Sequence, residues 1–190
     1  MFSLFALTLL SFSLEPLTNV KGWFLAGSER ESYEIGVVDD AERNGKVGFI
    51  KSTKTKIKGF GTIMQDFVPE DFYDQRVKLT AYIKTKDVAG WTGLWMRVDG
   101  LPAKDGKNRE VLSFDNMNDR KIVGTTGWTK YEIILDVPKD ATNIGYGVLL
   151  SGTGEAWLDD INFEIVDKKE QEATSTKTRL KAPTNTKFEE

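Results

Sequence analysis

The segment GWTGLWMRVDG, residues 90–100, places two tryptophans and an arginine on a run with the alternation of a β-strand. Successive side chains of a strand point to opposite faces, so Trp95 and Arg97 share one face. A flat ring beside a forked donor could hold a small polar ligand, with a sugar face on Trp95 and hydroxyls on Arg97. The alternative is that a loop covers this face and Arg97 pairs with a carboxylate. The residues of opposite parity are apolar and are predicted to enter the core: Leu94, Met96 and Val98.

A second group of polar residues lies in SFDNMNDRK, residues 113–121, which gathers acidic, amide and arginine side chains. Oxygen ligands at this density could hold a structural calcium ion. Asp and Asn are also common turn residues, however, and their spacing does not fit the EF-hand loop. A pair between Arg120 or Arg97 and a carboxylate, fixing the loop against the sheet, is the favoured alternative. We therefore predict no metal and no cofactor, with calcium as the alternative.

Gln65 in FGTIMQDF, residues 60–67, has the parity of Ile63 and Phe67. It is thus a polar group within an apolar face, where it must find a hydrogen-bond partner. The predicted ligand-binding set unites this residue with the candidates from the two segments above: Trp95, Arg97, Gln65, Asp115, Asn116 and Arg120.

Two further features have a structural and a functional interpretation. Gly145 and Gly147 leave one face of NIGYGVLLS bare, which could form a trough for a ligand or room for a tryptophan to lie flat within the protein. We favour the second. Asp159 and Asp160 are adjacent, so on a regular strand they point to opposite faces and cannot form a catalytic pair, unless a bulge lies there.

The residue types that are missing restrict the chemistry. The 190 residues include no cysteine and no histidine, which excludes disulfides, thiol or imidazole catalysis and the usual zinc ligands. The formal net charge is −3 and no segment carries a long run of Lys or Arg, which argues against nucleic acid as a partner of this chain alone. No catalytic residue is predicted. A glycosidase would need two carboxylates across a cleft, and no acid/base motif is recognisable.

The middle of the chain reads as short strands separated by turns. RVKLTAYIK (76–84) and KYEIILDV (130–137) alternate cleanly, and similar runs span 47–52, 60–67, 92–98, 110–115, 143–151 and 156–166. PEDFYDQ, residues 69–75, is expected to form one helical turn. Eight or nine short strands with no amphipathic stretch of helix length predict an all-β fold, an antiparallel β-sandwich of jelly-roll type.

The two ends differ from this middle part. The apolar run within residues 1–20 is too short to span a bilayer, so it is expected to be a signal peptide or a leader or linker cut from a longer chain. Residues 168–190 are polar and are expected to form a disordered tail. The β-sandwich domain is thus predicted over 21–167. The cytoplasm is the favoured compartment, with export if residues 1–13 are a signal peptide, and membrane association is not expected beyond such a leader. The oligomeric state stays open.

The runs GWFLAGSERESYEIGV, FGTIMQDF, GLWMRVD, LSFDNMNDRKIVGTTGW and GVLLSGTGEAWLDDINFEIV resemble a domain of some bacterial AraC-type transcriptional regulators. In those proteins it follows the helix-turn-helix pair. The same runs resemble the accessory domain of some tail-specific-protease-like peptidases. The ending G-x-x-W-L-D-D-x-x-F-x-x-V resembles the closing hairpin of galactose-binding-like carbohydrate-binding modules. These resemblances imply a jelly roll and no single ligand, and this chain carries neither DNA-binding helices nor a catalytic domain.

Two functions are therefore expected. The first is a non-catalytic ligand-binding module for a carbohydrate or another small polar ligand. The second is a structural or protein-interaction domain derived from the effector part of a transcriptional regulator or the accessory part of an enzyme. Its expected sign is a Trp95 wholly covered by its own chain.

Overall fold

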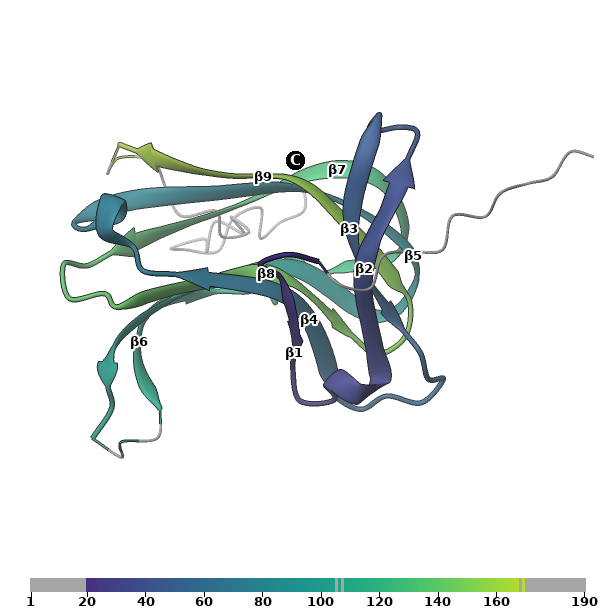
Figure 1. Ribbon diagram of the computed structural model, residues 1–190, viewed down its shortest axis with the longest axis horizontal. Helices are drawn as coiled ribbons and strands as arrows, with labels where there is room; N and C mark the ends of the chain where they lie inside the picture. The colour runs from purple at the N-terminus through teal and green to yellow at the C-terminus, as the bar shows by residue number, and fades with distance from the viewer. Residues whose placement is uncertain (1–19, 105, 107, 168, 170–190) are drawn as a thin grey trace, which may run out of the picture.

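The computed structural model describes residues 20–104, 106, 108–167 and 169 (Figure 1). The predicted leader (1–20) and tail (168–190) lie outside this part of the chain, apart from residues 20 and 169. Two 3-10 turns, η1 and η2, accompany the strands: η1 Arg30–Ser32 and η2 Glu70–Phe72. The strands are β1 Phe24–Ala26, β2 Tyr33–Asp40, β3 Gly45–Ser52, β4 Phe60–Phe67, β5 Gln75–Pro102, β6 Arg109–Asp115, β7 Ile122–Val137, β8 Asn143–Ser151 and β9 Glu155–Val166.

All strand pairings are antiparallel, and the order β1-β4-β8-β5-β9-β3-β2 makes one continuous path, with β6 and β7 also paired to β5. This path folds over on itself. The first half of β5 lies with β7 and β9, and its second half lies with β8 and β6, so β5 belongs to two layers (Figure 1). The predicted all-β antiparallel sandwich is confirmed.

β5 is a single strand of 28 residues, where the sequence predicts two strands over 76–84 and 92–98. Residues between the predicted strands remain paired with β7, β8 or β9, so no loop interrupts the chain. The register with β7 shifts three times between Ile83 and Thr92, and Asp87 has a φ of 52°. Such irregularities bend a strand and raise its twist, which lets β5 pass from one layer to the other.

The core lies between the two layers and is built from the faces that alternation predicts. Val77, Leu79, Ala81 and Ile83 are all 0% exposed, as predicted for the first half of β5. In the second half of β5, the predicted inward residues are equally enclosed: Leu94, Met96 and Val98. Full burial of one such aliphatic side chain contributes about 1.5–3 kcal/mol, so this strand is the largest single source of apolar stabilisation.

Some elements are not evident from the sequence. The predicted turn at 69–75 is confirmed as η2, but β1, β2 and the first half of β7 are absent from the predicted set. β2 has no clean alternation of buried and exposed residues. The first half of β7 is mostly exposed or half-buried and includes Gly124 and Gly127, so its residues do not show the pattern of a half-buried strand.

Charged and aromatic side chains interlock on the layer that contains β2, β3, β7 and β9. The Lys84 ammonium pairs with Asp40, and it lies 5.1 Å from the centre of the Trp128 ring and 5.4 Å from that of Trp157. The Arg43 guanidinium lies 4.4 Å from the centre of the Tyr82 ring. These contacts join the β2–β3 hairpin to β5, β7 and β9. Trp128 and Trp157 therefore serve as anchors between strands, half-buried at the surface.

The adjacent carboxylates Asp159 and Asp160 do not follow the rule for a regular strand. The β5–β9 register shifts between Thr80 and Tyr82, and Asp160 has a φ of 50°, so a β-bulge lies there. Both carboxylates consequently reach the same partner: Asp159 accepts a hydrogen bond from Arg43 Nε at 2.7 Å, and Asp160 pairs with Arg43 Nη2. The exception allowed for a bulge therefore applies here, and both acids pair with one arginine.

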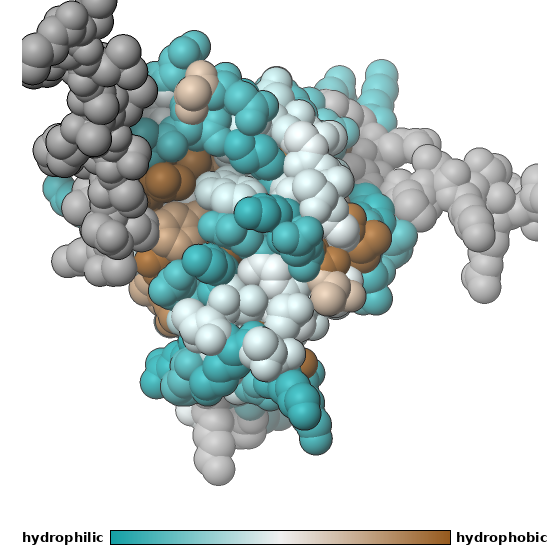
Figure 2. All heavy atoms as spheres, turned by 90° about the vertical axis from the view of Figure 1, so that its right-hand side faces the viewer, coloured by the Kyte–Doolittle hydropathy of each residue, from teal (hydrophilic) through white to brown (hydrophobic). Residues whose placement is uncertain are grey.

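The surface on the side of the β2–β3 hairpin is mixed in character (Figure 2). Hydrophilic side chains and side chains of intermediate hydropathy cover most of this face, and apolar side chains gather in small separate groups toward its left and right edges. Among the described residues, no helix combines the length and the apolar character that a membrane crossing needs.

Replacement of Lys84 by Met tests how much these charged and aromatic contacts contribute to stability. Burial alone would raise the pKa of Asp40, but the hydrogen bond and charge of Lys84 outweigh burial and lower this pKa. Lys84→Met leaves the Asp40 carboxylate, 9% exposed, without its cation, so we expect a loss of about 2 kcal/mol in the free energy of unfolding at pH 7. Because the pKa of Asp40 is lowered by folding, the stabilisation is present above about pH 4 and disappears as the pH falls further.

The measurement is urea unfolding of both proteins between pH 7 and pH 3. Lys51→Met is the matched control, because Lys51 is 48% exposed and its Glu34 partner 45% exposed. That control should change stability by less than about 0.5 kcal/mol. Equal losses for the two variants, or a difference that does not shrink in acid, would contradict the account.

Candidate ligand-binding site

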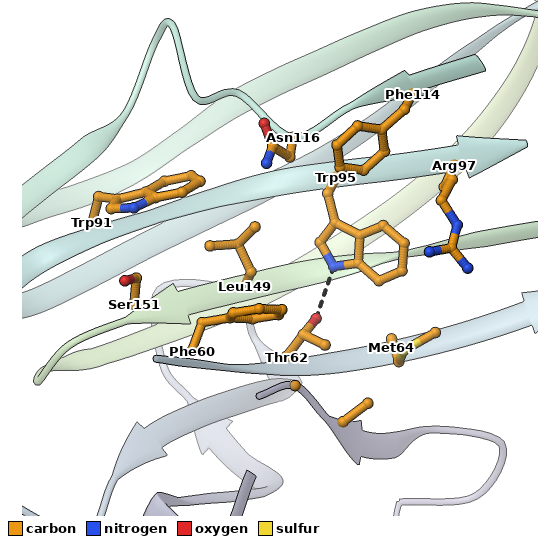
Figure 3. A pocket seen from close by; sticks show the side chains of 12 residues that line it. Phe60, Thr62, Met64, Trp91, Trp95, Arg97, Phe114, Asn116, Leu149 and Ser151 are labelled. Carbon is orange, nitrogen blue, oxygen red and sulfur yellow. Dashed lines mark hydrogen bonds between the residues drawn. The ribbon is translucent and has the colours of Figure 1, made fainter. Parts of the chain in front are cut away.

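A pocket of about 410 Å³ opens on the outer face of the layer formed by β1, β4, β8, the second half of β5 and β6 (Figure 3). Its larger lining side chains are apolar: Phe60, Met64, Trp91, Trp95, Phe114 and Leu149. Its polar side chains are few: Thr62, Arg97, Asn116 and Ser151. Cavities with aromatic walls and few polar groups are typical of small-ligand sites.

Strand alternation and register place these side chains together. Trp91, Trp95 and Arg97 have the outward parity of β5, opposite to the core residues. On β4, Phe60, Thr62 and Met64 have the same outward parity. β8 runs between β4 and β5 and pairs with both, with Gly147 opposite Met64 on one side and Trp95 on the other. On this face of β8, Leu149 and Ser151 line the pocket, whereas Gly145 and Gly147 do not.

Trp95 forms the floor of the pocket. It is 8% exposed, and its indole N–H donates to Thr62 Oγ1 at 2.7 Å (Figure 3). A Cβ on Gly145 would lie 3.4 Å from the six-membered ring of Trp95, so this ring lies flat against the glycine. A Cβ on Gly147 would lie 2.1 Å from the carbonyl oxygen of Ile63, which demands a glycine. The expectation that a glycine makes room for a flat tryptophan is confirmed at Gly145, whereas Gly147 makes room for the β4 backbone.

The exposed walls of the pocket come from residues outside the predicted set. Phe60 is 39% exposed and Phe114 is 51% exposed, and Trp91 stands at the far end of the pocket from Arg97 (Figure 3). Phe60 and Phe114 are not among the residues predicted from the sequence, and Trp91 is not in the predicted ligand-binding set. Strand parity could have indicated these rings, because Trp91 on β5, Phe60 on β4 and Phe114 on β6 all share the outward parity of Trp95. The sequence does not show which strands lie side by side, whereas the structure does.

Arg97 is paired with a buried carboxylate. Its Nε lies 2.8 Å from Asp99 Oδ1, and its Nη2 donates to Asp99 Oδ2 at 3.2 Å. Asp99 is 1% exposed, and its Oδ2 also accepts a hydrogen bond from Asn143 Nδ2 at 3.3 Å. The Arg97 side chain remains 47% exposed. The expected carboxylate pair thus occurs, and Arg97 also lines the pocket.

The 113–121 segment supports the pocket from one side. Arg120 Nη2 donates to Asp115 Oδ2 at 2.5 Å, so the loop is fixed by an arginine–carboxylate pair, the favoured alternative. Met117, 1% exposed with a φ of 60°, inserts into the core and holds the segment down. Only Asn116 of this segment's predicted residues lines the pocket. In the described part of the chain, no three acidic side chains form a group that could hold a metal.

Gln65 lies on the other face of the sheet from the pocket. Its Oε1 accepts a hydrogen bond from the Tyr146 hydroxyl, within a cluster in which the Tyr146 ring packs edge-on against Trp23, Phe67 and Phe163. Burial raises the pKa of Tyr146, so this hydroxyl stays protonated as a donor. The requirement for a partner is thus met within the protein. The structure brings Trp95, Arg97 and Asn116 to one pocket and separates Gln65 from them.

A comparison of sequences links the chain to a bacterial regulator. No family profile matches. The chain is 42% identical over 178 residues to the uncharacterized HTH-type transcriptional regulator YbfP of Bacillus subtilis strain 168, a match that covers 90% of this chain and 57% of YbfP. The chain therefore spans little more than half the length of this curated relative. A link to AraC-type regulators in particular, or to peptidases, remains a prediction.

A comparison of structures places the fold among carbohydrate-binding modules. The CBM22-1 xylan-binding domain of Paenibacillus barcinonensis Xyn10C is similar with a TM-score of 0.51 and 16% identity, over 80% of this chain and 90% of that domain. A candidate sugar-binding protein of Bacteroides thetaiotaomicron is similar with a TM-score of 0.57 and 14% identity, over 80% of this chain and 95% of that protein. At these identities the likeness shows a common fold, the jelly-roll sandwich of galactose-binding-like modules.

Replacement of Thr62 by Val tests the support under Trp95. Valine keeps the shape of threonine but removes the oxygen that accepts the indole N–H, so a buried donor loses its partner. The Thr62 hydroxyl also donates to the Val148 carbonyl at 3.0 Å, so this acceptor loses its donor as well. We expect Thr62→Val to lower the free energy of unfolding by about 1–3 kcal/mol and to shift the tryptophan emission.

The check is chemical denaturation followed by fluorescence, with the exposed Thr55→Val as the control. That control should stay within about 0.5 kcal/mol of the wild type. If Thr62→Val is as stable as Thr55→Val, Thr62 does not fix the ring.

Proposed function

We propose that this domain is a non-catalytic ligand-binding module that holds a carbohydrate in the pocket between Trp91, Phe60 and Phe114. The observation that carries the proposal is the combination of exposed aromatic walls with a few directed polar groups on one sheet face. Sugars present apolar C–H faces and polar hydroxyls, and aromatic rings with amide and guanidinium donors complement both. Within the pocket, Asn116 and Arg97 supply orientation, and the buried Trp95 fixes the floor.

The composition of the pocket supports binding without catalysis. None of the residues that line it is Asp or Glu. Hydrolysis of a glycosidic bond uses two carboxyl groups on either side of that bond, and the lining provides neither an acid nor a base for it. The likeness of the fold to xylan-binding modules is in keeping with this proposal. In a longer regulator related to YbfP, such a domain would supply the ligand-binding part.

A second candidate function, a structural or protein-interaction domain, is favoured by the enclosure of Trp95 and by the apolar surface around it. Phe24 is 43% exposed, and its register opposite Met64 places it on the same face as Phe60 and Phe114. Exposed aromatic side chains that gather on one face mark binding surfaces for proteins as well as for small ligands. Under this alternative no glycan enters the pocket, and loss of these rings weakens association with a protein.

Replacement of the exposed rings tests the proposal. Phe60→Ala and Phe114→Ala remove walls of the pocket while leaving the core intact. Loss of one stacking contact is worth about 0.5–1.5 kcal/mol, so each variant should weaken glycan binding by up to about tenfold at nearly unchanged stability. Binding is measured by tryptophan fluorescence and calorimetry against a panel of oligosaccharides that begins with xylohexaose.

Ile165→Ala is the matched control, because Ile165 is a 50% exposed apolar side chain on β9, in the other layer. Its affinity should equal that of the wild type. The carbohydrate proposal fails if no oligosaccharide of the panel binds the wild type. It also fails if Phe60→Ala and Phe114→Ala bind as well as Ile165→Ala does.

A further inference from the structure

The charges around the pocket bear on the class of sugar that it would accept under the proposed function. Arg97 is the single charged side chain among the residues that line the pocket. An arginine in a ligand pocket normally favours an anionic group, because its fork matches a carboxylate. The partners of Arg97 decide whether it can do so here.

Asp99 already neutralises Arg97 from beneath the surface. Two atoms of the guanidinium, Nε and Nη2, face the Asp99 carboxylate. Asp99 Oδ1 is fully enclosed and makes no well-aligned hydrogen bond, so the proximity of Arg97 is what compensates its charge. A ligand carboxylate that drew Arg97 away would leave a buried, unpaired anion, which is costly. The pair therefore acts as a fixed unit with no net charge.

The neighbouring strand adds a second acid beside the same arginine. Gly145 pairs with Arg97 on one side and with Asp66 on the other, which places Asp66 on the outer face across a glycine from Arg97. Asp66 is exposed. At the opposite end of the pocket, the exposed Lys121 ammonium lies 5.2 Å from the centre of the Trp91 ring. Among these four groups, the Arg97 end therefore has two acids, Asp99 and Asp66, against one cation.

Arg97 nevertheless keeps donors for a ligand. A guanidinium carries five N–H groups, and the contacts with Asp99 use one side of the fork. The side chain is 47% exposed and its guanidinium lies beside the indole of Trp95 at one end of the pocket (Figure 3). Neutral oxygen atoms, such as sugar hydroxyls and ring oxygens, can accept these hydrogen bonds without displacing Asp99.

We propose that the pocket selects uncharged sugars and discriminates against sugars that carry carboxylates, because the buried Asp99 holds Arg97 as a neutralised donor. This inference rests on the proposed carbohydrate function and adds to it the charge of the ligand. Asp99 is a positioning residue, since it acts on the ligand through Arg97.

The test compares neutral oligosaccharides with carboxylated counterparts of the same linkage, such as β-1,4-linked glucose with β-1,4-linked glucuronic acid. The wild type should bind the neutral member at least about tenfold more tightly, the ratio expected from one unfavourable charge contact. Since no net charge takes part, affinity for the neutral member should change little between about 0.05 and 0.5 M NaCl, where screening becomes strong.

Asp99→Asn keeps an acceptor for Arg97 but removes the negative charge, so the preference for the neutral member should fall by about fivefold or more. Asp39→Asn is the matched control, because it removes the same charge from a 53% exposed side chain on β2, in the other layer. It should leave the preference unchanged. A structural role for Asp99 alone would lower stability without moving this ratio.

The outcomes separate the two proposals. Equal or tighter binding of the carboxylated member by the wild type, or affinity for the neutral member that falls steeply with salt, overturns the charge selection while the carbohydrate function stands. Binding of neither class overturns the function itself and the charge selection with it. If Asp99→Asn does not fold, the wild-type ratio of affinities for the two sugars and the salt dependence of its affinity for the neutral member still test the charge selection.

Discussion

The structure depends on the burial of one face of β5 along both halves of its length. The inward residues of the first half pack in one region of the core and those of the second half in another, so a single strand joins the two layers. Because the side chains of a strand alternate with a period of two, burial of one face also determines which residues of β5 point outward. A slip of one residue would bury Arg97 and expose Met96. The packing of the core therefore determines where the pocket lies. It also holds the outer face of the second layer rigid.

Because this outer face is rigid, several side chains of the pocket are held in place before a ligand binds. Trp95 is held by Thr62 and lies flat on Gly145, and Arg97 is held by Asp99, so neither side chain has to be ordered when a ligand arrives. Preorganised groups lose less entropy on binding than mobile ones. The exposed rings of Phe60 and Phe114 differ, since they supply contact area at the surface. The proposed binding therefore separates into a fixed polar and aromatic floor and a set of apolar walls.

The alternation of single strands predicted the fold class, the core faces of β5 and the outward position of Trp95 and Arg97. These features depend only on local periodicity and hydropathy. Features that need the relative placement of strands were not accessible. Phe60 and Phe114 reach the pocket through register between β4, β8, β5 and β6, and the bulge at Asp160 depends on pairing with β5. For Gln65, parity correctly indicated an apolar face, but only the structure shows Tyr146 as its partner.

Under the proposed function, a glycan binds on the outer face at Trp91 and Trp95. The indole N–H signals of the five tryptophans in a nitrogen–proton correlation spectrum report on this directly, because they sample both layers. During titration with xylohexaose, or with whichever panel member binds, we expect the Trp91 and Trp95 signals to shift and those of Trp23, Trp128 and Trp157 to stay unchanged. Shifts confined to Trp128 and Trp157, on the opposite layer, would contradict binding at this pocket.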